Sequence, residues 1–252
     1  MISKEKIKFL RSLQQKKYRD KEQLYLAEGL KIVKELLIFQ PKNVAEIYLA
    51  DNFNADDIPG LKNFKQCSLI SANDLKKISA LKTPPGVLAI VKFNVNNKPD
   101  FTSDITLMLD RVQDPGNLGT IIRIADWFGI KQIVCSPDSV DCYNPKVVQS
   151  TMGAIFRVQV SYADLAEILK ENSGKVISYA TSLEGDNIYQ STLKTPSFIL
   201  MGNESKGLSE ELMDFADNKL KIPSFVSDGV TSESLNVSVA TGIICSEFRR
   251  RG

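Results

Sequence analysis

The chain has 252 residues, 43% of them hydrophobic and 25% charged, the balance of a globular protein with one large or two small cores. It contains no histidine, which excludes Ser-His-Asp and Cys-His catalysis and any histidine-ligated metal site. Its four cysteines show no CxxC spacing and are interpreted as reduced thiols. Because the sequence has neither a run of 18 apolar residues nor a secretory signal, we predict a cytoplasmic protein without a membrane span.

Charge is divided unevenly along the chain. Residues 1–104 carry 18 Lys and Arg against 12 Asp and Glu, a balance of +6, whereas residues 105–252 carry 14 against 18, a balance of −4. A basic first part indicates contact with a polyanion such as RNA. On charge alone, a merely solvated basic surface explains the same pattern equally well.

Residues 1–95 predict a small α/β unit. Apolar residues recur at helical spacing among the lysines of residues 2–23, which predicts a basic amphipathic helix there. A second helix follows Glu28-Gly29 and is expected to end at Pro41. The other elements expected here are strands at 24–27, 45–50, 67–70 and 87–93 and a helix at 72–79, capped by Ser71. The polar, aperiodic residues 96–104 predict a linker.

Residues 105–252 alternate between apolar strands and helices, the pattern of a parallel sheet with crossover helices. Strands are expected at 105–109, 132–135, 156–160, 176–180, 198–201 and 220–223. Helices are expected at 118–128, 144–153, 163–171 and 209–215, and from Ser234 onward.

Three polar, glycine-bearing loops follow predicted strands, at 110–119, 202–208 and 223–236. In open parallel sheets ligands bind at the carboxyl ends of the strands, so these loops predict one shared site. The first loop lacks the full GxGxxG pattern, and Leu208 stands where a phosphate loop requires lysine. Asp138, about twenty residues further on, leaves a degenerate NAD site open as an alternative.

Four side chains in or beside these loops are candidates for function. The guanidinium of Arg123 is suited to grip a phosphate, with a surface salt bridge as the plain alternative. Glu204, between two glycines, is placed either for ligand contact or for helix capping. Ser234 is expected to be the N-cap of the last helix, which leaves Asn236 inside its first turn, where asparagine is a poor helix former.

Three motifs together carry a family resemblance: Asp114 to Gly119 with Arg123, Met201 to Gly207, and Ile222-Pro223 followed by Ser234 to Ala240. In this order they resemble the motifs of the SpoU (TrmH-like) branch of the SPOUT RNA methyltransferases. Residues 1–93 are more loosely similar to the ribosomal-protein-like substrate-binding domain that often precedes that branch.

The resemblance implies a function and an assembly. A methyl group would pass from S-adenosylmethionine to the 2′-hydroxyl of one ribose in structured RNA, ribosomal RNA more than transfer RNA. Homodimers would form through the C-terminal helix, with Val237 to Phe248 at the interface, and no metal would take part. A binding module that has lost the chemistry and an NAD-dependent enzyme are the alternatives.

The resemblance also implies a fold and residue roles. The implied fold is an α/β parallel-sheet SPOUT domain at 105–252 with a deep trefoil knot, preceded by the small α/β domain at 1–95. The implied catalytic set is Asn117, Arg123, Glu204, Ser234 and Asn236. The implied cofactor contacts, largely through backbone, are Thr181, Gly202, Ile222 and Leu235. Because a guanidinium keeps its proton near neutrality, we expect Arg123 to bind the adjacent phosphate and stabilise the developing alkoxide.

Overall fold

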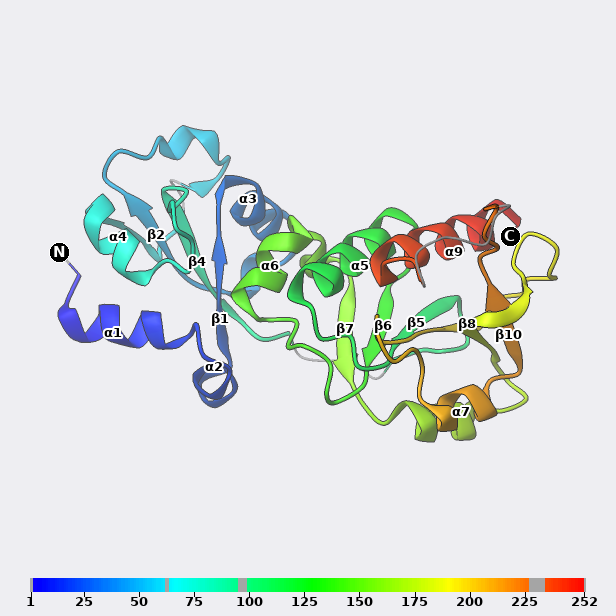
Figure 1. Cartoon of the computed structure of the whole chain (residues 1–252). Coiled ribbons are helices and arrows are strands. Elements are labelled where there is room, and N and C mark those ends of the chain that lie inside the picture. The colour runs from blue at the N-terminus through cyan, green and yellow to red at the C-terminus, as the bar shows by residue number, and fades with distance from the viewer. Residues whose placement is uncertain (1, 62–63, 95–98, 227–233, 252) are drawn as a thin grey trace. The chain divides into compact units, whose positions relative to one another are not determined.

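The computed structural model describes residues 2–61, 64–94, 99–226 and 234–251, and the chain divides into two compact units (Figure 1). The first unit comprises residues 1–95 and 141–157, and the second comprises residues 96–140 and 158–252. Residues 141–157 therefore pack with the first unit, although they lie inside the range 105–252 that the sequence predicted as one domain. Residues 96–98 of the predicted linker lie outside the described residues.

The first unit is a four-stranded sheet in the order β1-β4-β2-β3, in which only the β2–β3 pair is parallel. All four strands lie within one residue of their predicted bounds. They are β1 (Leu24–Glu28), β2 (Val44–Ala50), β3 (Cys67–Ile70) and β4 (Val87–Lys92). Helices α1 (Lys4–Ser12) and α4 (Ala72–Ile78) bury their apolar residues on one sheet face, and α3 (Leu30–Phe39) on the other.

The basic helix predicted within residues 2–23 is two helices, α1 and α2 (Lys16–Glu22). The guanidinium of Arg19, only 2% exposed, donates hydrogen bonds to the carbonyl oxygens of Leu13 and Gln14 at 3.1 and 2.8 Å. Those carbonyls belong to the break between the helices. The break is therefore stabilised by a side chain five and six residues away, whose guanidinium also donates to Asp141, a contact that no local pattern reveals.

The segment 141–157 completes the α3 face of the first unit. Its helix α6 (Pro145–Thr151) and 3₁₀ helix η4 (Ala154–Phe156) add buried side chains to the α3 core, and Tyr143 stacks on Tyr25 with ring centroids 4.4 Å apart. Asp141 accepts hydrogen bonds from the buried Arg19. The strand predicted at 156–160 begins at Gln159 instead, because η4 occupies residue 156.

The second unit is a six-stranded, fully parallel sheet, as predicted. Its order is β10-β8-β9-β5-β6-β7. The strands are β5 (Ile105–Leu109), β6 (Gln132–Cys135), β7 (Gln159–Tyr162), β8 (Ile177–Asn187), β9 (Ser197–Met201) and β10 (Asn218–Lys221). Every residue of β5 and β9 is buried, as expected for central strands covered on both faces.

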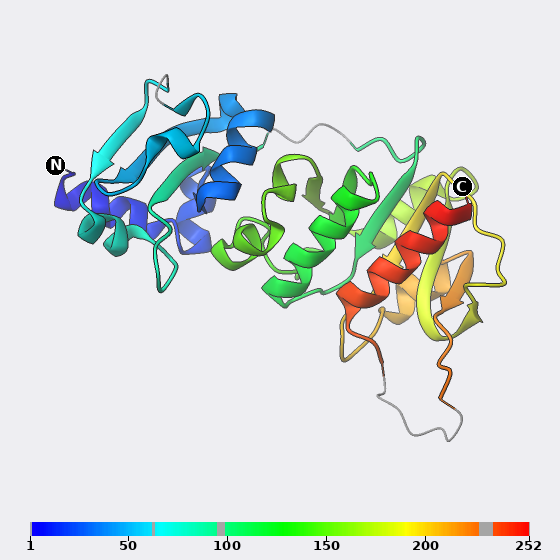
Figure 2. The ribbon, with the colours of Figure 1, turned by 90° about the horizontal axis from the view of Figure 1, so that it is seen from above.

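Helices α5 (Pro115–Trp127) and α9 (Val237–Arg251) lie side by side on one face of this sheet (Figure 2). Helices α7 (Leu165–Asn172) and α8 (Glu210–Phe215) pack on the other face. Within the described residues, no helix is long and apolar enough to cross a bilayer. Strands β10, β8, β9 and β5 are consecutive in the sheet, so the loops at their carboxyl ends share one edge.

Candidate active site

A cavity of about 640 Å³ opens at the carboxyl ends of β9 and β10 and beside residues 181–184 of β8, within the volume range of small-molecule sites. All four residues predicted to hold the cofactor line it: Thr181, Gly202, Ile222 and Leu235. Glu204 and Ser234 of the predicted catalytic set line it as well. The structure thus brings these six residues to one cavity; the role of each stays a prediction.

Strand β8 supplies one wall of the cavity because it is irregular. Its pairing with β10 jumps from Ala180 opposite Lys219 to Asp186 opposite Leu220, so residues 181–185 leave the regular ladder. Leu183 and Glu184 in this bulge line the cavity. A Cβ at Gly185 would lie 2.6 Å from the carbonyl carbon of Leu220, so only glycine fits where β8 returns to the ladder.

Gly202 brings backbone to another part of the cavity wall. A Cβ there would lie 2.3 Å from the Gly207 carbonyl carbon and 2.3 Å from the Leu208 nitrogen. The loop returns this close because Asn203 and Gly207 exchange two backbone hydrogen bonds, of 3.0 and 2.9 Å. The cavity wall is therefore main chain at a point where no side chain fits.

Gly202→Ala is expected to weaken S-adenosylmethionine binding by about tenfold or more, because overpacking costs roughly 1–3 kcal/mol and the backbone must move into the cavity. Isothermal titration calorimetry measures the effect. Gly174→Ala is the matched control, since alanine at its φ of +74° also costs stability but Gly174 does not line the cavity. Unchanged affinity in Gly202→Ala would show that this wall does not contact the cofactor.

Three predicted catalytic residues form a chain of hydrogen bonds. The Asn117 side-chain amide donates to Glu204 Oε1 at 2.5 Å, and its oxygen accepts from Asn236 Nδ2 at 2.9 Å. Glu204 lies in the segment that follows β9, Asn117 in the one that follows β5, and Asn236 in the one that follows β10. Because the Asn117 amide donates through its nitrogen and accepts through its oxygen, its orientation is fixed. The fixed amide in turn holds the Glu204 carboxylate in one orientation.

Local capping places Asn117 and Asn236. Asp114 caps α5 by accepting from the backbone nitrogen of Asn117 at 2.9 Å, so the helix begins at Pro115, earlier than predicted. Asn236 caps α9, its Oδ1 accepting from the backbone nitrogens of Ser238 and Val239 at 3.0 and 3.3 Å. The predicted cap at Ser234 is therefore wrong, and Asn236 precedes the helix instead of lying inside its first turn.

Arg123 and Ser234 stand apart from this chain. Arg123 is exposed on α5, roughly 9 Å along the helix axis from Asn117. Its guanidinium makes no hydrogen bond or ion pair with any residue that the structure describes. The alternative interpretation of Arg123 as part of a surface salt bridge therefore finds no acidic partner among these residues. Ser234 is exposed at the cavity, and residues 227–233 of the same predicted loop lie outside the described residues.

The cysteine in α9 does not offer a nucleophile. Cys245 is fully buried, and burial raises the pKa of its thiol to about 12, although Arg249 acts in the opposite direction. Among the described ranges, no group of three or more His, Cys, Asp or Glu side chains lies together as a metal site. The polar side chains at the cavity are thus amides, hydroxyls, carboxylates and the ammonium group of Lys206, which position a substrate and stabilise charge.

Two parts of the chain match known families. Residues 104–246 match the SpoU rRNA methylase family, and residues 4–89 match the MRM3-like substrate binding domain. A curated relative, 23S rRNA (guanosine(2553)-2′-O)-methyltransferase RlmP of Bacillus subtilis, is 32% identical over 97% of this chain and 96% of its own length.

Solved structures agree with these matches. A TrmH-family protein from Porphyromonas gingivalis superposes with a TM-score of 0.88 and 36% identity over 100% of both chains. An AdoMet-bound rRNA methyltransferase from Sinorhizobium meliloti superposes with a TM-score of 0.86 and 28% identity, covering 99% of this chain and 96% of its own. Because the first family match alone spans more than half of the 252 residues, this chain belongs to the SpoU rRNA methylase family.

Proposed function

We propose that this protein transfers a methyl group from S-adenosylmethionine to the 2′-hydroxyl of a specific ribose in structured RNA, ribosomal RNA rather than transfer RNA. The observation that carries the proposal is the hydrogen-bond chain from Glu204 through Asn117 to Asn236, beside a cavity walled by backbone. The relative RlmP, which matches this chain along almost its whole length, is named for such a methyl transfer to 23S rRNA.

The cavity fits the cofactor in size and chemistry. Thr181, Gly202, Ile222 and Leu235 would hold it, and the close backbone approach at Gly202 suits contact through main-chain groups. The carboxylates of Glu184 and Glu204 and the ammonium group of Lys206 line the same cavity, which suits a ligand that carries both positive and negative groups. S-adenosylmethionine supplies an activated methyl group on a positively charged sulfonium.

The residues of this chain act mainly by positioning. As the ribose oxygen forms its bond to the methyl carbon, the carbon–sulfur bond breaks and sulfur keeps the electron pair. The hydroxyl proton leaves through the adjacent phosphate, Glu204 or water. Asn117 and Asn236 hold the Glu204 carboxylate in place, and Arg123 binds the phosphate and stabilises the developing alkoxide. Such pre-set geometry and charge supply most of the rate in this class of transfer.

A direct assay tests the proposal. Purified protein is incubated with S-adenosylmethionine carrying a labelled methyl group and with total RNA from cells lacking this protein. We expect label in ribosomal RNA, with transfer slowed by about 100-fold in Glu204→Gln. A protein that labels no RNA would refute the function, and a thermal shift by NAD but not by S-adenosylmethionine would favour the NAD alternative.

Residues 1–95 are proposed as the RNA substrate-binding domain, joined by residues 96–104 to a methyltransferase domain at 105–252. The match of residues 4–89 to a substrate-binding family supports this, as does the charge of +6 on residues 1–104. Lys4, Lys8 and Arg11 are exposed at helical spacing on one side of α1. Cations presented in this way bind RNA phosphates independently of the nucleotide sequence, and their affinity for RNA falls as the salt concentration rises.

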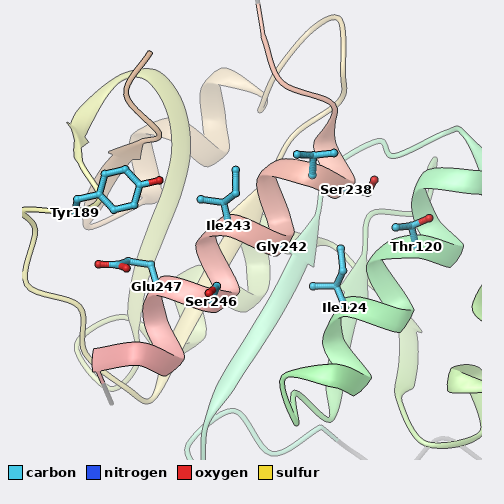
Figure 3. Close-up of a pocket in the computed structure, with 9 residues that line it drawn as sticks. Thr120, Ile124, Tyr189, Ser238, Gly242, Ile243, Ser246 and Glu247 are labelled. Atoms are coloured by element: carbon cyan, nitrogen blue, oxygen red, sulfur yellow. The ribbon is translucent and has the colours of Figure 1, made fainter. Parts of the chain in front are cut away.

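The proposal includes a homodimer that forms through α5 and α9. A groove of about 470 Å³ runs between these helices, lined by Thr120 and Ile124 of α5 and by Val239, Gly242, Ile243 and Ser246 of α9 (Figure 3). Trp127 follows on the same side of α5 and is 85% exposed. Small and apolar side chains exposed together on two neighbouring helices support contact with a second copy of the chain.

Ile243→Arg is expected to give a single species near the chain mass of 28.0 kDa in analytical ultracentrifugation, whereas the wild type sediments as a dimer. A buried, unpaired guanidinium opposes association. Ile38→Arg is the matched control, because Ile38 is 68% exposed on α3 and the variant should remain dimeric. A monomeric wild type, or a dimeric Ile243→Arg, would contradict the proposed interface.

A deep trefoil knot in the second unit and a cytoplasmic location complete the proposal. The knot is proposed from the family resemblance, with which the packing of the last helix, α9, on α5 is consistent. The knot and the cytoplasmic location are predictions, and neither has been tested.

A further inference from the structure

Glu204 belongs to a small loop that its neighbour Asn203 organises. The Asn203 side-chain oxygen accepts from the backbone nitrogens of Ser205 and Lys206 at 3.0 and 3.1 Å. The backbone of Asn203 also pairs with that of Gly207 on both sides. One asparagine therefore gives the loop its internal shape, but these bonds do not fix where the loop lies relative to β5.

The other end of the same side chain makes that connection. Asn203 Nδ2 donates to the carbonyl oxygen of Arg111 at 2.8 Å, across to the segment that follows β5. Arg111 has a φ of +55°, a left-handed conformation that costs a non-glycine residue about 1–2 kcal/mol. Its own backbone nitrogen is fixed by Ser136 Oγ at 2.8 Å. Strain of this kind persists only where surrounding contacts determine the backbone.

Asp110 anchors the far end of the loop. This residue is only 4% exposed, and its carboxylate accepts from the backbone nitrogen of Ser209 at 2.8 Å. The Arg111 guanidinium donates to both oxygens of the same carboxylate, at 3.2 and 3.0 Å, which compensates the buried charge. The segment from Asn203 to Ser209 is thus held at both ends by the dipeptide Asp110-Arg111.

We propose that Asn203 is a positioning residue for the reaction, which holds the Glu204 carboxylate against Asn117 through the Arg111 carbonyl, with Asp110 as the second anchor. The inference rests on the proposed function, because it concerns the placement of Glu204. Glu204 follows Asn203 directly, so a loop released from Arg111 moves the carboxylate away from the 2.5 Å contact with Asn117. A displacement of about 1 Å at a reacting site can cost 100-fold in rate.

Two substitutions separate the loop's internal shape from its attachment. Asn203→Asp keeps the acceptor oxygen for Ser205 and Lys206 but loses the donor to Arg111, whereas Asn203→Ala loses both. If attachment positions Glu204, the two variants lose kcat by a similar factor, about 30- to 100-fold, measured at saturating S-adenosylmethionine because Asn203 also lines the cavity. If only the internal shape matters, Asn203→Asp matches the wild type, which would overturn the inference.

The pH profile supplies a second readout. The backbone nitrogens of Ser205 and Lys206 would donate to the carboxylate introduced by Asn203→Asp, which keeps it ionised and unable to donate to the Arg111 carbonyl near neutral pH. The kcat of Asn203→Asp relative to wild type should therefore stay low from about pH 8 to about 6, as should that of Asn203→Ala. A ratio for Asn203→Asp that reaches the wild-type value anywhere in this range would contradict the role of the donor. A wild type that transfers no methyl group would refute the proposed function instead.

Discussion

Asn117→Asp is expected to slow methyl transfer by about 100- to 1,000-fold, the loss seen when one preorganised donor is removed from a reacting site. The new carboxylate cannot donate to Glu204, and the two negative charges repel each other at the position of a 2.5 Å contact. The carboxylate can still accept a hydrogen bond from Asn236, so the contact between residue 117 and the N-terminus of α9 is retained. Single-turnover rates at saturating cofactor and RNA measure the effect.

Asn172→Asp is the matched control for this change. Asn172 lies at the end of α7, where its amide donates to the Ile168 carbonyl at 2.8 Å, away from the residues that line the cavity. We expect its rate to equal that of the wild type. A rate for Asn117→Asp within threefold of wild type would remove the hydrogen-bond chain from the mechanism.

Arg123→Lys is expected to retain most RNA affinity and to lose about 100-fold in turnover. Lysine keeps the charge that attracts phosphate but not the planar fork that holds it bidentately beside the developing alkoxide. Arg123 is exposed and its guanidinium makes no hydrogen bond or ion pair within the described part of the chain, so thermal stability should not change. RNA binding by filter retention and turnover by label transfer are measured on the same preparation.

Arg123→Ala extends this test by removing the charge as well. It should weaken RNA binding and also lose turnover, with a smaller dependence of RNA affinity on salt. Full turnover in Arg123→Lys would contradict a bidentate role, and full turnover in Arg123→Ala would exclude Arg123 from the reaction.

Strands and their direction were predictable from the sequence because burial on both faces leaves continuous apolar runs. Strands β5 and β9 are such runs, and both occur within one residue of the predicted bounds. Strand β8 was predicted to end at Ala180 but continues to Asn187. Its bulge carries Leu183 and Glu184 to the cavity, and since the strand bends there, no alternating pattern marks it.

Contacts between distant residues were beyond the reach of sequence patterns. Asn117 and Glu204 are 87 residues apart, and Arg19 and Asp141 are 122 apart. Segment 141–157 joins the first unit through such contacts, whereas its place between two strands of the second sheet suggested otherwise. Asn236 was singled out because asparagine is poor inside a helix, and the structure supplies the reason: it caps α9 and bonds Asn117.

The same limit applies to the residues that hold the catalytic loop. Asn203 and Asp110 were not among the predicted site residues, because each is ordinary in its local context: one follows a glycine and the other follows a buried strand. Their partners are 92 and 99 residues away. Only the folded chain shows that both meet at the loop carrying Glu204.

Mapping of ribose methylation tests the central claim most directly. RNA from cells with and without this protein is hydrolysed in alkali, which cleaves after every nucleotide except those with a methylated 2′-oxygen. The account predicts one protected position in ribosomal RNA that disappears without the protein, returns with the wild type and does not return with Asn117→Asp. Identical protection patterns in both cells, or full restoration by Asn117→Asp, would contradict it.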